Sequence, residues 1–122
     1  MENKKIVLII EDSEDFVFLM KEYLRLAGID AIAANNYREA MLIFNQQRED
    51  IQAIILDACL ESHEIDTLPL LKKLIQAGFS GPIVAGSMHE KHNELLKAAG
   101  ATHQALKHLA AQLTIKLLAS NT

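Results

Sequence analysis

Hydrophobic and polar positions follow two different periods along this chain. Continuous apolar runs of strand length occupy Ile6–Ile10 and residues 53–56, and such runs are typical of strands buried on both faces. After the first run, apolar residues recur every three or four positions, at Phe16, Met20 and Leu24, which predicts an amphipathic helix. The same alternation continues to the end of the chain, so strands and helices are expected to follow one another.

Five strand–helix units are predicted. Strands are expected at residues 6–10, 30–34, 53–56, 83–87 and 103–106, and helices through residues 16–27, 37–44, 68–75, 90–99 and 109–117. Gly28 and Gly100 are expected to end the first and fourth helices. Tyr37, Phe44 and Phe79 stand at apolar spacings and are expected in the core. The fold class is therefore a three-layer α/β, doubly wound (βα)5 flavodoxin-like fold with a parallel sheet in the order 2-1-3-4-5.

Composition narrows the class of protein. The 122 residues suit one domain over residues 1–122, with no output domain visible after the fifth helix. No apolar run is long enough for membrane insertion, and the single cysteine, Cys59, suits a cytoplasmic location. A net charge of −4 without a basic stripe argues against direct binding to nucleic acid.

Polar residues follow the predicted strands. Because the carboxyl ends of parallel strands lie at one edge of a sheet, the side chains that follow the strands can converge there. These residues are Glu11, Asp12, Asp57, Ser87 and Lys107. Helix capping by Asp12 or Ser13 explains the acids of the next turn. It does not explain Glu11 beside Asp12, because adjacent carboxylates repel unless a cation or a shared proton lies between them.

This set of groups suits phosphoryl chemistry. Mg²⁺ prefers oxygen ligands and commonly combines one or two carboxylates with waters and a phosphate, and Glu11, Asp12 and Asp57 offer such oxygens. A cation there would favour in-line transfer of a phosphoryl group to Asp57. Lys107 would hold the phosphoryl group from the other side, and Ser87 would donate its hydroxyl to a phosphoryl oxygen.

The ordered motifs resemble the receiver domain of two-component response regulators, the CheY-like family. They are the acidic pair after the first strand, "IILDACL" with Asp57, "PIVAGSM" with Ser87 and "GATHQALK" with Lys107. The resemblance implies that Asp57 is the phospho-acceptor and that the backbone carbonyl of Cys59 joins the three acids around Mg²⁺, which Mn²⁺ can replace.

The resemblance to receiver domains also implies the partners and the activity. A receiver takes its phosphoryl group from a histidine kinase or a histidine phosphotransfer protein and then docks onto a downstream protein, which the sequence does not identify. It is not an enzyme beyond slow Mg²⁺-dependent self-phosphorylation and autodephosphorylation.

Several positions depart from the family pattern. Glu61 and Ile65 stand where a proline and a glycine usually follow the phospho-acceptor, so the loop is expected to take a different path. Gln104 replaces the usual switching aromatic residue, and His108 replaces the proline after the lysine. These departures keep open the alternative of a degenerate receiver that binds a partner without phosphorylation.

A third class, a true enzyme on a similar sheet, fits less well. An aspartyl-phosphate phosphatase would carry a second acid two residues after the nucleophile, where Cys59 stands, and a flavodoxin needs a hydroxyl-rich loop after the first strand. His89 and His92 have the spacing of helical metal ligands, but no third ligand lies nearby in the sequence. They are interpreted as solvated surface residues.

Overall fold

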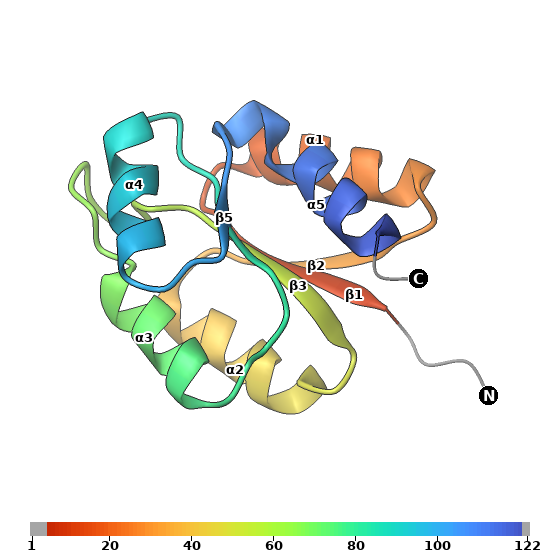
Figure 1. The fold of residues 1–122 in the computed structure, drawn as a ribbon, viewed down its shortest axis with the longest axis horizontal. Helices are drawn as coiled ribbons and strands as arrows, with labels where there is room; N and C mark the ends of the chain where they lie inside the picture. Colours follow the sequence, from red (N-terminus) through yellow and green to blue (C-terminus); the bar gives the residue numbers. More distant parts are fainter. Residues whose placement is uncertain (1–4, 121–122) are drawn as a thin grey trace.

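A computed structural model describes residues 5–120 and contains one parallel sheet of five strands in the order β2-β1-β3-β4-β5 (Figure 1). The strands are β1 (Ile6–Ile10), β2 (Asp30–Ala34), β3 (Ile51–Leu56), β4 (Ile83–Ala85) and β5 (His103–Gln104). This is the α/β architecture and strand order that the alternating pattern predicts.

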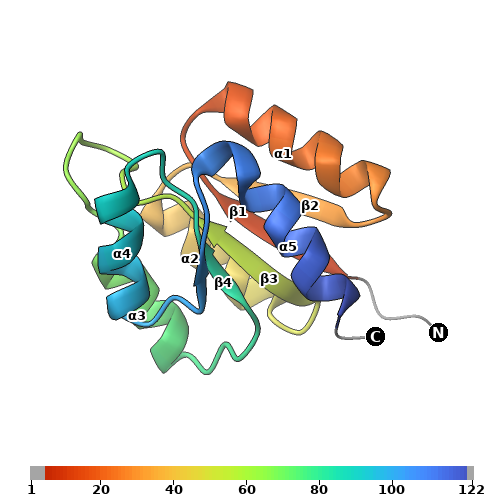
Figure 2. The same ribbon diagram turned by 45° about the horizontal axis from the view of Figure 1, so that its top comes forward.

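Five α-helices cover the two faces of the sheet. They are α1 (Glu14–Leu26), α2 (Tyr37–Gln47), α3 (Leu68–Gln76), α4 (Glu90–Ala98) and α5 (Ala110–Ala119), and a 3₁₀ turn, η1 (Lys107–Leu109), precedes the last one. Helices α1 and α5 pack side by side on one face, and α2, α3 and α4 lie on the other (Figures 1 and 2). The three layers are thus helix, sheet and helix.

Strand β1 shows why its run is apolar throughout. Leu8 and Ile10 belong to the core under α2, α3 and α4, whereas Val7 and Ile9 belong to the core under α1 and α5. Successive side chains of a strand point to opposite faces, so a strand covered on both sides needs apolar residues at every position. All five residues of β1 are buried, which holds the strand's carboxyl end firmly between β2 and β3.

The last two strands are shorter than the sequence predicts. We expected them to extend to residues 87 and 106, but pairing ends at Ala85 with Gln104. The buried side chain of Asn93, in α4, accepts a hydrogen bond from the Ser87 amide at 2.8 Å and donates to the Ala105 carbonyl at 3.0 Å. These backbone groups are therefore taken by a side chain and cannot extend the β4–β5 ladder.

One expectation about apolar side chains is wrong. Tyr37 begins α2 and is partly exposed, while Phe44 is fully buried and packs edge-on against Phe79. Leu109 lies in the 3₁₀ turn and is exposed, because the inward stripe of α5 is formed by Ala110, Ala111 and Thr114. Small residues at those positions allow α5 to approach the sheet closely.

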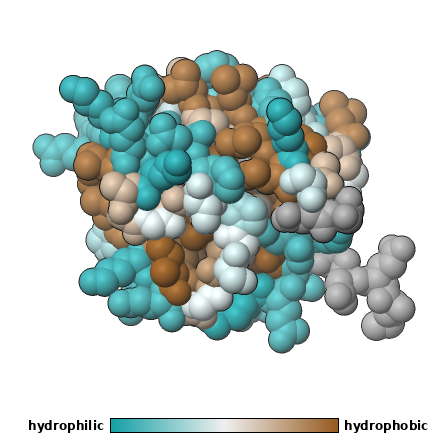
Figure 3. Space-filling view, in the orientation of Figure 1, coloured by the Kyte–Doolittle hydropathy of each residue, from teal (hydrophilic) through white to brown (hydrophobic). Residues whose placement is uncertain are grey.

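The surface of the molecule is mixed in character. In the view of Figure 3, hydrophilic side chains gather over α4, and hydrophobic ones are more frequent over α1 and α5. Among residues 5–120, no helix combines the length and the hydropathy that a membrane span requires.

Candidate phosphoryl-acceptor site

Three carboxylates meet where β1 and β3 end. Ile10 pairs with Leu56 in the sheet, so the residues that follow, Glu11 and Asp57, are brought together. Glu11 is 1% exposed and Asp57 is 4% exposed, whereas Asp12 is open to solvent. One oxygen from each of Glu11, Asp12 and Asp57 lies within 4.8 Å of the others. The acids that the sequence places at the strand ends therefore form one cluster.

Lys107 is the cation that faces this cluster. Its Nζ lies 3.0 Å from Oε1 of Glu11 and donates a hydrogen bond to Oδ2 of Asp57 at 3.1 Å. The contact with Glu11 has ion-pair distance but not the direction of a hydrogen bond, so that buried oxygen has no hydrogen-bond donor among residues 5–120. The Lys107 ammonium also lies 5.0 Å from the centre of the Phe16 ring, an arrangement that favours a cation.

The electrostatics of the cluster show that one lysine does not balance three acids. Burial, and secondly the charge of Asp57, raise the pKa of Glu11 to about 7, although the Ser13 amide and Lys107 act in the opposite direction. Burial alone would lower the pKa of Lys107, but the close contact with Glu11 and the charges of both acids together raise it. The site therefore lacks positive charge when all its acids are ionised.

These residues fit a hard divalent cation. The donor set consists of carboxylate oxygens, one of them exposed and one of them without a hydrogen-bond donor, and Mg²⁺ selects oxygen ligands. Asp57 would remain well oriented with a cation present, because its Oδ1 accepts a hydrogen bond from the Ala58 amide at 2.8 Å. Added positive charge would also relieve the repulsion that raises the pKa of Glu11.

Ser87 lies at the end of β4 and lines the same cleft. It is 3% exposed, and its Oγ accepts a hydrogen bond from the His89 amide at 3.1 Å. Its amide and carbonyl groups are both bound to the side chain of Asn93, at 2.8 and 2.9 Å. The loop that carries Ser87 is thus held by Asn93. Sequence reasoning missed this residue, because a single asparagine within a predicted helix shows no distinguishing pattern.

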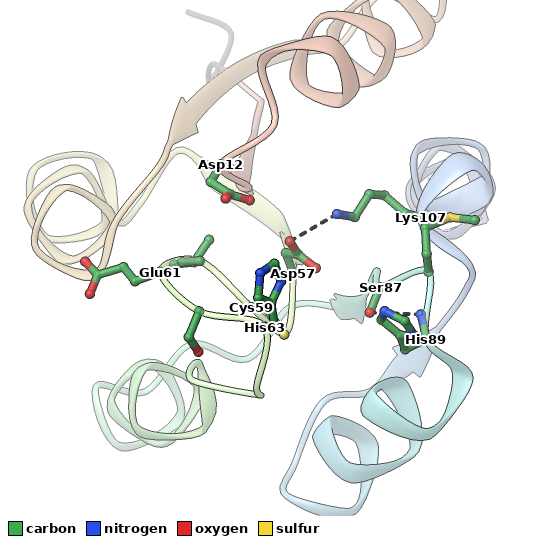
Figure 4. Close-up of a pocket in the computed structure, with 11 residues that line it drawn as sticks. Asp12, Asp57, Cys59, Glu61, His63, Ser87, His89 and Lys107 are labelled. Atoms are coloured by element: carbon green, nitrogen blue, oxygen red, sulfur yellow. Dashed lines mark hydrogen bonds and ion pairs between the residues drawn. The ribbon is translucent and has the colours of Figure 1, made fainter.

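The cleft above Asp57 has a volume of about 420 Å³. Figure 4 shows Asp12, Asp57 and Lys107 converging on one side, with Ser87 and His89 on the other. Cys59 also lines the cleft, and Glu61 points away from Asp57 (Figure 4). Met88, which follows Ser87, is 47% exposed at the rim. The sequence-predicted site residues other than Glu11 thus line one cavity.

The loop after β3 is organised by two residues that sequence reasoning did not single out. Asp66 accepts hydrogen bonds from the Leu60 and Glu61 amides, both at 2.8 Å. Thr67 donates from its Oγ1 to the carbonyls of Asp57 and Ala58, at 2.8 and 3.1 Å. Side chains from the start of α3 therefore hold the backbone on either side of the Asp57 peptide, without the usual proline and glycine.

Comparison with known families identifies the fold. The family model of the response regulator receiver domain matches residues 7–118. The chain belongs to this family. A receiver domain of two-component systems therefore accounts for almost the whole sequence.

Solved structures agree with this assignment. The chemotaxis protein CheY4 of Vibrio cholerae has a TM-score of 0.77 and 22% identity, over 96% of this chain and 98% of that chain. A two-component response regulator of Clostridium difficile has a TM-score of 0.79 and 22% identity, over 96% of this chain and 94% of that chain. The receiver domain of NtrX from Brucella abortus has a TM-score of 0.77 and 22% identity, over 94% of this chain and 95% of that chain. At these identities the likeness shows the fold, and no curated protein matches the sequence.

Membership of the family carries general properties. Receiver domains bind Mg²⁺, are generally not true enzymes, and interact with histidine kinases or phosphotransfer proteins and with downstream effectors. For Mg²⁺ binding, this chain has suitable residues, since Glu11, Asp12 and Asp57 form the acidic cluster that such a cation requires.

Proposed function

We propose that this receiver accepts a phosphoryl group on Asp57 from a phosphohistidine of a kinase or phosphotransfer protein, and then signals by docking onto a downstream protein. The observation that carries the proposal is the Asp57 carboxylate, which lies beside a 420 Å³ cleft within reach of Lys107 and the acidic pair. The proposed cation ligands are Glu11, Asp12, Asp57 and the backbone carbonyl of Cys59.

Each group has a defined part in the transfer. A carboxylate oxygen of Asp57 forms a bond to phosphorus as the bond from phosphorus to the donor imidazole breaks, and the imidazole leaves with its electron pair. Bound Mg²⁺ supplies positive charge for the phosphoryl oxygens during this in-line transfer. Lys107 already contacts Oδ2 of Asp57 at 3.1 Å, so its ammonium is placed to pair with the new phosphoryl charge.

Ser87 serves to detect the product rather than to make it. Its hydroxyl oxygen accepts from the His89 amide, which leaves its own hydrogen available to a phosphoryl oxygen. Because Asn93 binds the Ser87 backbone and the Ala105 carbonyl, a movement of Ser87 would be transmitted to the segment that leads into Lys107. Phosphorylation would thus shift the loops after β4 and β5 together.

The decisive experiment is incubation with Mg²⁺ and acetyl phosphate, followed by intact mass spectrometry. The wild-type protein should gain one phosphoryl group, and Asp57→Asn should gain none, because an amide is not a nucleophile. Asp30→Asn is a matched control, since Asp30 is an exposed aspartate at the start of β2. Equal labelling of Asp57→Asn and the wild type would assign the chemistry to another residue.

A degenerate receiver is the second candidate, and the rebuilt loop after β3 favours it. Asp66 and Thr67 hold that loop where Glu61 and Ile65 replace the usual residues, which would give a fixed docking surface without phosphorylation. The same experiment separates the candidates, because a degenerate receiver would gain no phosphoryl group in any variant.

A further inference from the structure

A thiol and two imidazoles meet beside the acidic cluster. Sγ of Cys59 lies 3.7 Å from Nδ1 of His92, and the rings of His89 and His92 meet edge to face with centroids 5.0 Å apart. The sequence pattern shows only the two histidines, because Cys59 and His92 are 33 residues apart. The fold thus brings together three residues that commonly bind transition metals. We propose that Cys59, His92 and His89 form a binding site for a thiophilic divalent cation such as Zn²⁺.

The spacing of the first two ligand atoms fits one ion. Zinc lies about 2.3 Å from a cysteine sulfur and about 2.0 Å from a histidine nitrogen, so tetrahedral ligands of these two kinds are roughly 3.5 Å apart. The observed separation of Cys59 Sγ and His92 Nδ1 is 3.7 Å. A zinc ion therefore fits between these atoms with only a small adjustment of either side chain.

His89 completes the set from the same helix end. Residues three apart are neighbours on a helix surface, and His89 immediately precedes α4 while His92 lies in its first turn. The His89 backbone is fixed by its hydrogen bond to Ser87, but its side chain is exposed. A rotation of the exposed ring would bring a nitrogen toward an ion held by Cys59 and His92, and water would take the fourth position.

The surroundings favour a dication over an anion. The carboxylates of Asp57 and Asp66 give the surroundings of Cys59 a negative potential. The same negative potential that opposes a lone thiolate attracts a doubly charged cation. Sulfur and imidazole are softer ligands than the oxygens of Glu11, Asp12 and Asp57, so the two neighbouring sites would select different metals.

An ion at this site would have a consequence for signalling, and this consequence rests on the proposed function. It would link the loop after β3 to the start of α4 and, through His89, to the segment that carries Ser87. Cys59 and His89 both line the cleft above Asp57. Bound zinc should therefore restrain Ser87 and slow phosphoryl acceptance by Asp57.

Cobalt(II) is the probe of choice, because a cobalt–thiolate bond gives an intense near-ultraviolet band that oxygen ligands do not give. The titration is performed under reducing conditions with excess Mg²⁺ present to occupy the carboxylates. The wild-type protein should bind one equivalent with this band, and Zn²⁺ should remove it by displacement. Absence of a thiolate band at equimolar Co²⁺ would overturn the proposal.

Variants assign the ligands. Cys59→Ser should lose the band, and His92→Gln and His89→Gln should each weaken binding at least tenfold, since even outer-shell partners of a metal are worth roughly 10–100-fold in affinity. Asp12→Asn and His103→Gln are controls that should retain the band. An unchanged affinity in His92→Gln would refute the site, and in His89→Gln it would refute the third ligand.

Two further arms separate this site from the proposed function. Asp57→Asn should lose phosphoryl acceptance but retain the cobalt–thiolate band, which would show that the metal site stands by itself. Zinc should slow labelling by acetyl phosphate in the wild type and not in Cys59→Ser. Equal slowing in both proteins would overturn the regulatory consequence.

Discussion

The two halves of the sheet's carboxyl edge are built in different ways. In the acceptor half, defined by Glu11, Asp12, Asp57 and Lys107, ion pairs join charged side chains to one another, and two of the carboxylates also accept from backbone amides. In the transmitting half, defined by the loops after β3 and β4 and by β5, the main contacts run from a polar side chain to backbone groups. Asp66, Thr67 and Asn93 make these contacts.

This difference indicates which departures a receiver can accommodate. Phosphoryl transfer depends on a few charged atoms at fixed positions, and all of the expected ones are present here. A loop instead requires that its backbone groups be satisfied, which many side chains can do. Ile65 packs against the core and Asp66 binds the loop amides, so the missing proline and glycine are replaced by other contacts.

The largest effect is expected from Lys107→Met, which removes the cation of the acceptor half. Glu11 and Asp57 would remain buried without a partner, and such a loss costs roughly 3–5 kcal/mol. The free energy of unfolding, measured in denaturant without divalent metal, should fall by about this amount. Mg²⁺ should restore more stability to this variant than to the wild type, because no ammonium competes with the ion.

Lys97→Met is the control, since Lys97 is an exposed lysine in the last turn of α4. Equal losses in the two lysine variants would contradict an acceptor half held together by charge.

In the transmitting half, Asn93→Ala should cost about 3 kcal/mol. The substitution leaves the Ser87 amide and two carbonyls without their partner, and each buried unsatisfied group costs roughly 1–3 kcal/mol. NMR shifts should change together at Ser87 and Ala105, the two segments that Asn93 joins. Glu94→Ala, at the exposed next position, should change neither the stability nor these shifts. Shifts at Ser87 alone would show that the segments are not joined.

The pH dependence of stability tests the charge balance of the acceptor half. The pKa of Glu11 is raised from 4.5 to about 7, so its contribution to stability is complete below pH 4.5 and is lost as the pH rises through 7. The loss should reach about 3 kcal/mol in metal-free protein. Glu11→Gln should flatten this part of the stability profile, and so should Mg²⁺. A profile unchanged by Glu11→Gln would place the titration elsewhere.

The smallest effect is expected from Gln104→Ala. Gln104 is the last residue of β5 and is only partly buried, so stability should change by less than about 0.5 kcal/mol. With a beryllium fluoride phosphate mimic, NMR shifts at Ser87 and Lys107 should be as large in this variant as in the wild type. Reduced shifts at both would show that Gln104 transmits the change after all.

The sequence predicted the layers from local patterns, and the fold class that these patterns indicate then predicted the strand order and the meeting of the acidic residues at one edge. Five apolar positions in a row are enough to place β1 inside a parallel sheet, where it lies between β2 and β3. Parallel strands with right-handed connections then bring Glu11 and Asp57 to one edge.

The missed residues act over distance and on backbone groups. Thr67 binds a carbonyl ten residues before it, and Asn93 binds one twelve residues after it. A threonine before a helix normally predicts a cap, but the Thr67 hydroxyl binds the Asp57 carbonyl instead. The ends of β4 and β5 were predicted too late for the same reason, since the Asn93 side chain takes the backbone groups that would extend them.

Because β5 is short, this edge of the sheet should open locally. A two-residue edge strand is joined to β4 by few backbone hydrogen bonds, so this edge should separate from the sheet at a lower free energy than global unfolding requires. The amides of β1 should exchange with solvent deuterium only through global unfolding, whereas the Ser87 amide, bound to Asn93, should exchange through this smaller opening. The exchange rate at Ser87 would thus report how often the transmitting half detaches while β1 stays folded.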